Sequence, residues 1–278
     1  MKCLITGAKG QLGREFVRAL ENLKAEFLAL GREELDIRDF HKVLDIFKQF
    51  KPQVVINCSA YNQVDKAEDE FDKALSVNCI GVSNLATACR ETGAFLVHYS
   101  TDYVFDGEKK GLYTEDDTPN PLSKYALSKY LGEKQIEAVL ENYLIFRTSW
   151  VYGEGTQNFL YKLTQWINTQ EYLKIACDEF SVPTSTKIIV DVTLKALKKG
   201  FKGLFHLVCS GYASRYEWAK EYLKIKGLKK FIYPAYMAEF NLPAKRPRFS
   251  AMSNEKISRV LNISIPNWDD ELKKFLGG

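Results

Sequence analysis

Short apolar segments alternate with longer segments of helical period through the first half of the chain. Strands that alternate with helices are typical of a parallel sheet covered on both faces. The pattern therefore predicts an α/β fold with a doubly wound parallel sheet. The predicted strands are Lys2–Thr6, Phe27–Leu30, Val54–Cys58, Phe95–Ser100 and Tyr143–Thr148, and the predicted helices are Gln11–Asn22, Asp39–Phe50, Phe71–Glu91 and Leu122–Glu141.

The regular alternation weakens after about Trp150. Prolines then mark turns among shorter elements, at Pro183, Pro234, Pro243, Pro247 and Pro266. We predict that residues 1–150 form the main domain and that residues 151–278 form a smaller cap, mainly for substrate binding. Some of its elements are expected to return to the main sheet.

Composition excludes several classes of protein. A chain of 278 residues can bury roughly 75% of its unfolded surface, so it needs neither disulfides nor structural metals to fold. The formal net charge is 39 − 35 = +4 and is scattered, so no nucleic-acid partner is expected. The six cysteines form no CxxC pair and are expected to be reduced thiols. No apolar run approaches the ~20 residues of a membrane helix, and no signal peptide precedes the first strand, so the cytoplasm is expected.

A glycine-rich loop directly follows the first predicted strand. Gly7, Gly10 and Gly13 are spaced as GxxGxxG, with Gln11 and Leu12 between the last two. Glycines there allow a tight turn and let backbone N–H groups approach a pyrophosphate at the helix N-terminus. The alternative is an ordinary strand-to-helix turn. The position of the loop at the start of an alternating pattern favours a Rossmann-type dinucleotide site.

The end of the second strand bears on the choice of cofactor. NAD-binding folds place an acidic residue there to bind the ribose 2′-hydroxyl, whereas this chain has Gly31-Arg32. Arg32 predicts NADPH, with its 2′-phosphate, as the preferred cofactor and NADH as a usable one, although a solvated surface arginine is the alternative. Further cofactor contacts are expected from Asp36, Ile37, Ala60, Tyr61 and Asn62.

Three residues form a candidate catalytic group. Tyr125 and Lys129 lie four apart on one predicted helix face, and Thr101 follows the fourth strand. A tyrosine can protonate the oxygen of a ketone, and a nearby ammonium is expected to lower its pKa. Lys129 can also hold the nicotinamide ribose, and Thr101 can orient the substrate oxygen. A YxxxK pair alone is often a surface pair, but its order after the glycine loop and Thr101 indicates a reductase.

Longer motifs make the resemblance specific. The chain resembles the dTDP-4-dehydrorhamnose reductases, which are extended short-chain dehydrogenases/reductases of dTDP-rhamnose and cell-surface polysaccharide biosynthesis. The generic segments are Gly7–Gly13 and Tyr125–Lys129; the more specific ones are Val64–Glu68, His98–Phe105, Phe146–Tyr152, Val182–Thr184 and Ala244–Pro247.

The resemblance implies an activity and a set of contacts. It implies NADPH-dependent reduction of the 4-keto group of dTDP-4-dehydro-L-rhamnose, a dTDP-linked 4-keto-6-deoxy-hexose. It assigns Thr101, Tyr125 and Lys129 to catalysis, and Asp102 and Trp150 to the sugar nucleotide. Arg246, or Arg248 near it, would neutralise the diphosphate. Core packing is the alternative for Trp150, and a solvated loop is the alternative for the arginines.

Two other functions fit the same motifs. A sugar-nucleotide epimerase or dehydratase shares the fold and the triad, but dehydratases of this superfamily place an Asp-Glu pair after the strand-four threonine, where this chain has Asp102-Tyr103. A regulatory subunit of methionine adenosyltransferase binds NADP on the same fold without known need for turnover, and fold does not fix function.

One feature departs from part of the resembled family. Some of these reductases are dimers joined around Mg²⁺ through carboxylates on the first helix, after the Pro-Thr motif and near the C-terminus. Glu15 lies on the first predicted helix, but Lys187 follows Pro183-Thr184 where a second carboxylate is expected. An ammonium cannot ligate a hard cation. We therefore expect no bound metal, and a monomer or weak homodimer.

Overall fold

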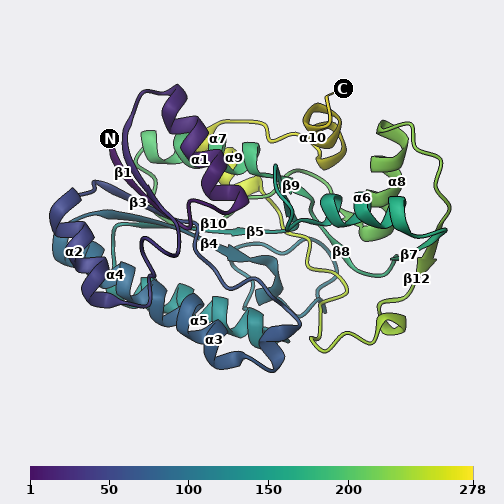
Figure 1. Ribbon diagram of the computed structural model, residues 1–278, viewed down its shortest axis with the longest axis horizontal. Helices are drawn as coiled ribbons and strands as arrows, with labels where there is room; N and C mark the ends of the chain where they lie inside the picture. The colour runs from purple at the N-terminus through teal and green to yellow at the C-terminus, as the bar shows by residue number, and fades with distance from the viewer. Residues whose placement is uncertain (278) are drawn as a thin grey trace.

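Six parallel strands form the sheet from which the rest of the molecule is built (Figure 1). The structure is a computed structural model and describes residues 1–277. The spatial order of the strands is β10-β5-β4-β3-β1-β2. Their bounds are β1 Lys2–Thr6, β2 Glu26–Leu30, β3 Val54–Asn57, β4 Phe95–Thr101, β5 Tyr143–Thr148 and β10 Gly203–His206. The α/β fold with a doubly wound parallel sheet is confirmed.

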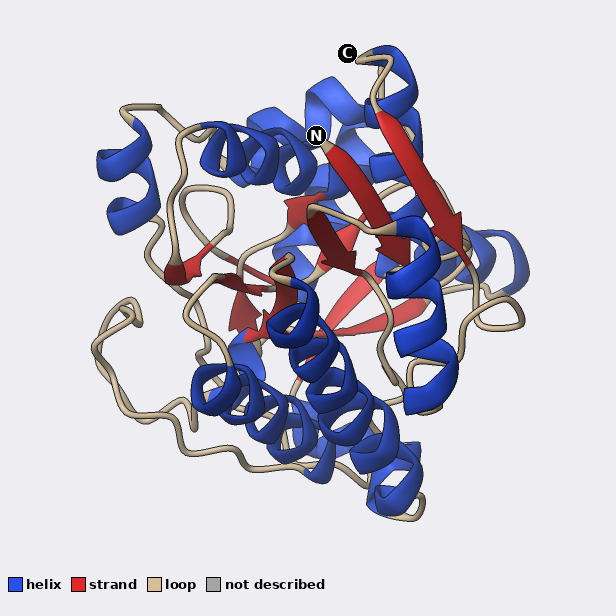
Figure 2. Ribbon diagram, turned by 90° about the vertical axis from the view of Figure 1, so that its left-hand side faces the viewer, coloured by secondary structure: helices blue, strands red, loops and turns tan. Residues whose placement is uncertain are grey.

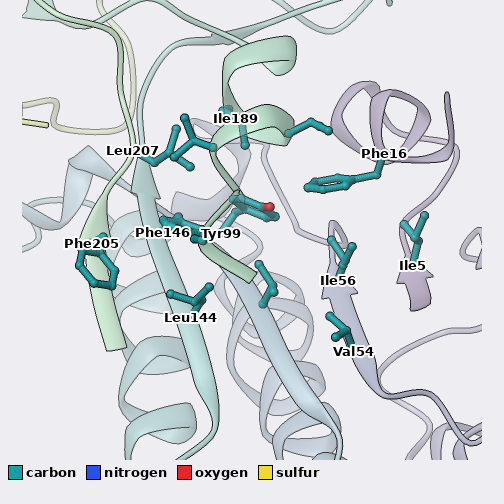
Figure 3. Packing of buried hydrophobic residues seen from close by; sticks show 14 of the residues in the cluster. Ile5, Phe16, Val54, Ile56, Tyr99, Leu144, Phe146, Ile189, Phe205 and Leu207 are labelled. Atoms are coloured by element: carbon teal, nitrogen blue, oxygen red, sulfur yellow. The ribbon is translucent and has the colours of Figure 1, made fainter. Parts of the chain in front are cut away.

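Helices cover both faces of this sheet (Figure 2). One face is covered by α1 (Gln11–Asn22), α7 (Thr186–Lys198) and α9 (Glu255–Leu261), and the other by α2 (Phe40–Phe50), α4 (Gly81–Thr92) and α5 (Lys124–Val139). Alternate residues of β1 pack on opposite faces of the sheet. Cys3 and Ile5 belong to the apolar cluster on the first face, and Leu4 belongs to the cluster on the second. Figure 3 shows the first cluster, in which Tyr99 lies between Phe16 and Phe146.

The predicted helix over residues 71–91 is interrupted. It consists of α3 (Phe71–Leu75), one π-helical turn at Ser76–Ile80 and α4. The wide turn carries the buried Asn78 toward α5 and the loop after β3. The Asn78 amide accepts a hydrogen bond from the backbone N–H of Tyr61 and donates to the carbonyl of Tyr61 and the hydroxyl of Ser128. A regular helical period could not reveal this turn, because the hydrogen bonds that stabilise it are tertiary.

Most of the remaining elements lie beyond the carboxyl end of the sheet. They are α6 (Phe159–Thr169), α8 (Arg215–Ile225) and α10 (Trp268–Phe275), with the strand pairs β6–β9 (Val151–Tyr152, Thr184–Ser185), β7–β12 (Leu173–Ala176, Ile232–Ala235) and β8–β11 (Phe180–Ser181, Ala213–Ser214). Short 3₁₀ turns span Lys66–Glu68, Asp102–Val104 and Met237–Phe240. A separate apolar cluster holds this region together, with Trp218 at its centre and Trp150, Tyr152 and Leu163 around it. The domain boundary at residue 150 stays a prediction, and no helix within residues 1–277 is long and apolar enough to cross a membrane.

Helix α5 is fixed against the sheet by a buried ion pair and by a close backbone contact. Arg147 on β5 donates to Glu133 from Nε at 3.0 Å and from Nη2 at 2.7 Å, and both side chains are buried. Gly132 faces the π turn so closely that a Cβ there would lie 2.1 Å from the carbonyl oxygen of Asn78. Since α5 also carries Tyr125 and Lys129, these two contacts set the position of the candidate catalytic residues.

The glycine contact predicts a stability effect. Gly132→Ala should lower the free energy of unfolding by about 1–3 kcal/mol, because the methyl group meets a backbone atom and forces the π turn and α5 apart. Urea denaturation followed by circular dichroism measures the change. Leu127→Ala, at an exposed position of the same helix, is the control and should change the free energy by no more than ~0.5 kcal/mol. An unchanged midpoint for Gly132→Ala would show that the contact is loose.

Candidate active site

The glycine loop joins β1 to α1 at the carboxyl edge of the sheet. Gly7 has a φ of +62°, and a Cβ there would lie 2.7 Å from the backbone of Cys58, so only glycine fits. Gly10 caps α1 without a side-chain hydrogen bond, which leaves N–H groups of the first helical turn for a ligand. Together with the partial positive charge of a helix N-terminus, these groups suit a diphosphate.

Two adjoining cavities extend from this loop in opposite directions. They measure about 260 and 340 Å³, the size of small-molecule sites. The first contains Thr101, Tyr125 and Lys129, and the second contains Gly31 and Arg32. Gly10, Cys58, Ser59, Ala60, Asn62 and Gln157 line both. The arrangement is that of a long cleft with the candidate catalytic residues at one end, which suits an extended dinucleotide.

Nearly all of the predicted cofactor residues lie along this cleft. The first cavity is lined by Gln11 and Leu12, the second by Gly7, Arg32, Asp36, Ile37 and Tyr61, and both by Gly10, Ala60 and Asn62. Gly13 is the exception, since it is buried and lines neither cavity. It lies behind the loop, where it allows α1 to approach β1, so its prediction as a cofactor contact is not supported by this placement.

The loop after β2 places more carboxylates near the end of that strand than the sequence pattern indicated. The Glu34 side chain reaches back to accept a hydrogen bond from the backbone N–H of Gly31 at 2.9 Å. Lys9 pairs with Glu34 at 2.8 Å and with Glu33 at 3.1 Å. Arg32 has a side chain 75% exposed, and its Nε lies 3.9 Å from Asp36. The region therefore presents one exposed arginine beside the carboxylate of Asp36, which is also paired with Arg38.

Thr101, Tyr125 and Lys129 come together at the end of β4. Ser123 caps α5 by accepting a hydrogen bond from the N–H of Ala126, which places Tyr125 in the first turn and Lys129 one turn later. Thr101 ends β4, accepts from the N–H of Tyr103 and donates to Asp102, each at 3.2 Å. All three side chains are buried and line the same cavity.

Burial controls the ionisation of this group. It raises the pKa of Tyr125 well above its usual range; the charge of Asp102 adds to the rise and the hydroxyl of Thr101 opposes it. The expected lowering of this pKa by Lys129 is not found in this structure, in which the Lys129 amine donates to the carbonyl of Tyr99 at 2.6 Å. Burial lowers the pKa of Lys129 to about 8, against the opposing charge of Glu133. Tyr125 is therefore protonated at neutral pH and ready to act as an acid.

Asp102 is a buried carboxylate with three hydroxyl donors. It accepts from Ser181 at 2.7 Å, from Ser250 at 2.5 Å and from Thr101. Burial raises its pKa to about 6, and these hydrogen bonds oppose the rise. Asp102 lines the first cavity as predicted, but its oxygens are engaged inside the protein, so it supports Thr101 more directly than it can reach a ligand.

Trp150 lies at the far end of the first cavity in a strained conformation. Its φ is +39°, a region that costs a non-glycine residue about 1–3 kcal/mol. The Arg215 guanidinium lies 3.6 Å from the centroid of the Trp150 ring and 5.6 Å from that of Trp218, and the two indole rings stack at 5.7 Å. The indole nitrogen is buried and has no hydrogen-bond partner within residues 1–277. The site therefore offers a fixed aromatic wall and a spare donor to a ligand.

Arg246 and Arg215 lie beside a further cavity in the cap. Arg246 forms an ion pair with Asp65 at 2.7 Å, and both arginines line this cavity with Glu179. Glu179 is buried, accepts from the hydroxyl of Tyr103 at 2.6 Å and lies 3.5 Å from Arg215. Sequence analysis did not identify Arg215 or Glu179, because neither belongs to a motif and only the fold of the cap brings them to this cavity.

The structure also bears on the metal prediction. Within residues 1–277, no group of three or more His, Cys, Asp or Glu side chains is arranged to hold a metal ion. Lys187 is exposed on α7, with its ammonium 5.7 Å from the ring centroid of Phe275. Glu15 pairs with Arg18 at 3.2 Å. The absence of bound metal stays a prediction.

Comparisons by sequence and by structure match this chain to the same group of proteins. The family model described as "RmlD substrate binding domain" matches residues 1–277. The dTDP-4-dehydrorhamnose reductase of Burkholderia thailandensis is 35% identical, over 96% of this chain and 95% of its own. The crystal structure of a dTDP-4-dehydrorhamnose reductase from Clostridium acetobutylicum superposes with a TM-score of 0.96 at 39% identity, over 99% of this chain and 98% of that one.

A third relative was solved with its cofactor. The dTDP-4-dehydrorhamnose reductase of Bacillus anthracis, in complex with NADP, has a TM-score of 0.95 and 32% identity, over 99% of this chain and 98% of its own. These matches span the glycine loop, the catalytic group and the cap alike. The chain therefore belongs to the RmlD family of oxidoreductases, the family of the dTDP-4-dehydrorhamnose reductases.

Proposed function

We propose that this protein reduces the 4-keto group of dTDP-4-dehydro-L-rhamnose to the alcohol of dTDP-L-rhamnose, with NADPH as the preferred cofactor. The observation that carries the proposal is the convergence of Thr101, Tyr125 and Lys129 on one cavity that continues to the glycine loop. A protonated, buried tyrosine suits reduction because the product oxygen needs a proton. The names of the relatives support the substrate.

The residues that line the cleft would have different roles in binding and in catalysis. The first turn of α1 would hold the diphosphate of the cofactor, and Lys129 would hold the nicotinamide ribose. When bound, NADPH supplies the hydride that is added to the carbonyl carbon. Tyr125 gives its phenolic proton to the carbonyl oxygen, so that the ketone gains one hydride and one proton and becomes an alcohol.

Thr101 would orient the ketone. Its hydroxyl donates to Asp102 at 3.2 Å in this structure, and rotation of that hydrogen toward the substrate oxygen gives up one weak bond. Asp102 keeps its two serine donors when this happens. Both serines donate to Oδ2, so the exchange takes the Thr101 donor from Oδ1, and the carboxylate keeps two of its three hydroxyl hydrogen bonds.

Incubation with the keto-sugar nucleotide tests the proposal. Loss of NADPH absorbance with formation of one equivalent of the 4-hydroxy sugar would support it. An epimerase or dehydratase would change the sugar without net NADPH loss, and a regulatory NADP-binding protein would bind the cofactor without turnover. Either result would overturn the proposal. Asp102-Tyr103 already disfavours dehydration, because the second position lacks the carboxylate of a dehydratase.

The first catalytic prediction concerns the acid. Tyr125→Phe should bind NADPH normally but lower kcat by about 10²–10⁴-fold, the usual contribution of general acid catalysis. Stopped-flow absorbance gives the rate, and fluorescence titration gives the cofactor affinity. Tyr103→Phe removes the hydroxyl of the neighbouring ring, which contacts Tyr125 edge-on, and should have a much smaller effect. Comparable rates in the two variants would remove Tyr125 from the proton step.

The second concerns the lysine. Lys129→Met keeps an unbranched side chain but removes the nitrogen, so it should weaken NADPH binding as well as turnover, since Lys129 is assigned to the ribose. The matched comparison is Tyr125→Phe, which should leave binding intact. Equal NADPH dissociation constants for Lys129→Met and the unaltered protein would limit Lys129 to a role in the chemical step.

The third concerns cofactor preference. Arg32→Ala should lower the NADPH/NADH ratio of kcat/KM by about tenfold, the lower end of what a charge-assisted contact contributes, because this side chain is largely exposed. Glu33→Gln removes a charge of the same loop that contacts only Lys9 and serves as the control. An unchanged ratio in Arg32→Ala would show that Arg32 does not contact the 2′-phosphate.

The fourth concerns metal and assembly. We expect full activity in EDTA and a mainly monomeric protein, because Lys187 follows Pro183-Thr184 where part of the family is expected to have a carboxylate ligand. Light scattering with and without Mg²⁺ measures the mass. Lys187→Glu restores the charge of a ligand and provides a matched variant in which a metal-dependent dimer can be sought. A dimer of the unaltered protein that dissociates on chelation would contradict the prediction.

A further inference from the structure

A chain of buried hydrogen bonds runs between the strands of the sheet and ends at Lys129. It begins at Thr6, at the end of β1, and runs through Asn57, at the end of β3, to His98 on β4. Thr6 and His98 have no exposed surface, Asn57 is 1% exposed and Lys129 is 3% exposed. Because water cannot exchange with these groups, the direction of each hydrogen bond is set by its neighbours.

The orientation of the Asn57 amide is fixed. Its Oδ1 accepts from the backbone N–H of Ser59 at 3.0 Å, and an N–H can only donate. The Thr6 hydroxyl adds a second bond to the same oxygen at 2.7 Å. Nδ2 of Asn57 therefore faces Nδ1 of His98, at 3.0 Å. Since an amide nitrogen is a donor only, Nδ1 of the imidazole must be the acceptor.

The tautomer of His98 follows from this contact. Burial holds the pKa of His98 well below its usual range, so the ring is neutral. A neutral ring that accepts at Nδ1 carries its hydrogen on Nε2. That nitrogen lies 3.5 Å from Nζ of Lys129. An ammonium has no lone pair to receive an N–H, whereas a neutral amine has one.

We propose that His98 is a positioning residue that favours the neutral amine of Lys129 in the free enzyme, so that Lys129 takes up a proton when NADPH binds. The Nε2–H of His98 favours the amine, and the Tyr99 carbonyl, which accepts from Lys129 at 2.6 Å, holds the nitrogen in place. A bound dinucleotide brings ribose hydroxyls and negative charge that favour the ammonium. The inference rests on the cofactor site of the proposed function and not on the sugar.

The other ionisable groups around Lys129 do not titrate in the same range. Tyr125 stays protonated, and burial keeps the Cys58 thiol protonated by raising its pKa. Asp102 has a pKa of about 6, and Glu133 is held in its ion pair with Arg147. Lys129, with a pKa of about 8, is thus the group poised to gain a proton near that pH.

The tautomer can be observed directly. The chain has three histidines, so ¹⁵N-labelled imidazole gives few NMR signals, and loss of one signal in His98→Gln assigns it. We expect the nitrogen shifts and proton couplings of His98 to show hydrogen on Nε2 and none on Nδ1. A wild-type protein with hydrogen on Nδ1 would overturn the proposal, whatever the protein's activity toward the keto-sugar.

Proton uptake is measured by calorimetry of NADPH binding in two buffers of different ionisation enthalpy. At pH 8 the wild type should take up about half a proton per NADPH, because Lys129 is then half protonated when free. His98→Phe keeps the shape of a flat ring but removes the N–H, so its uptake at the same pH should be smaller than that of the wild type. Absence of uptake by the wild type, or wild-type uptake by His98→Phe, would overturn the proposal.

Two variants that do not touch Lys129 complete the test. Asn57→Asp presents only acceptors when ionised, which favours hydrogen on Nδ1 of His98 and leaves Nε2 free to accept from the ammonium. Thr6→Val is the matched control, because the N–H of Ser59 still fixes the Asn57 amide. In each variant the proton uptake on NADPH binding must follow the His98 tautomer seen by NMR. A variant with hydrogen on Nε2 should take up a proton, and one with hydrogen on Nδ1 should not. A variant in which tautomer and uptake do not agree in this way would overturn the proposal.

Discussion

A single buried carboxylate, that of Asp102, connects the two parts of the molecule that must meet for catalysis. It follows the last residue of β4 and receives hydroxyls from Thr101 beside it, from Ser181 on β8 and from Ser250 near the C-terminus. An unpaired charge at this depth would cost several kcal/mol. The cap segments that carry the two serines are therefore held against the catalytic strand, and the cavity between sheet and cap keeps its shape.

The sheet was predicted well from the sequence, and most of the residues predicted to contact the cofactor line the cleft, because both depend on local pattern. The first strand, the first helix and the fifth strand have the predicted bounds, since short apolar runs and glycine turns determine them. Asn78 is different: its π turn depends on contacts with Tyr61 and Ser128, far away in sequence. The same holds for Glu34, whose position against Gly31 required the path of the loop after β2.

The substrate end was the least predictable part of the site. Trp150 was identified from a motif, but its strained backbone and the stacking of Arg215 on its ring depend on how α8 folds over it. The pKa of Tyr125 was expected to be lowered but is raised, for a related reason. Spacing on a helix shows which side chains share a face, but it does not show that the amine of Lys129 donates a hydrogen bond to a carbonyl of β4.

The late return of β10 to the sheet also has a consequence for how the chain can be divided. Residues 203–206 pair along β5 and cover what would otherwise be an open edge. The covered strand, Tyr143–Thr148, is apolar along most of its length and buried. A fragment ending near residue 150 would keep every cofactor residue of the glycine loop yet expose this strand, and such an edge invites pairing between molecules. The part of the chain that carries the glycine loop thus depends on β10, far along the sequence, to cover the edge of its sheet.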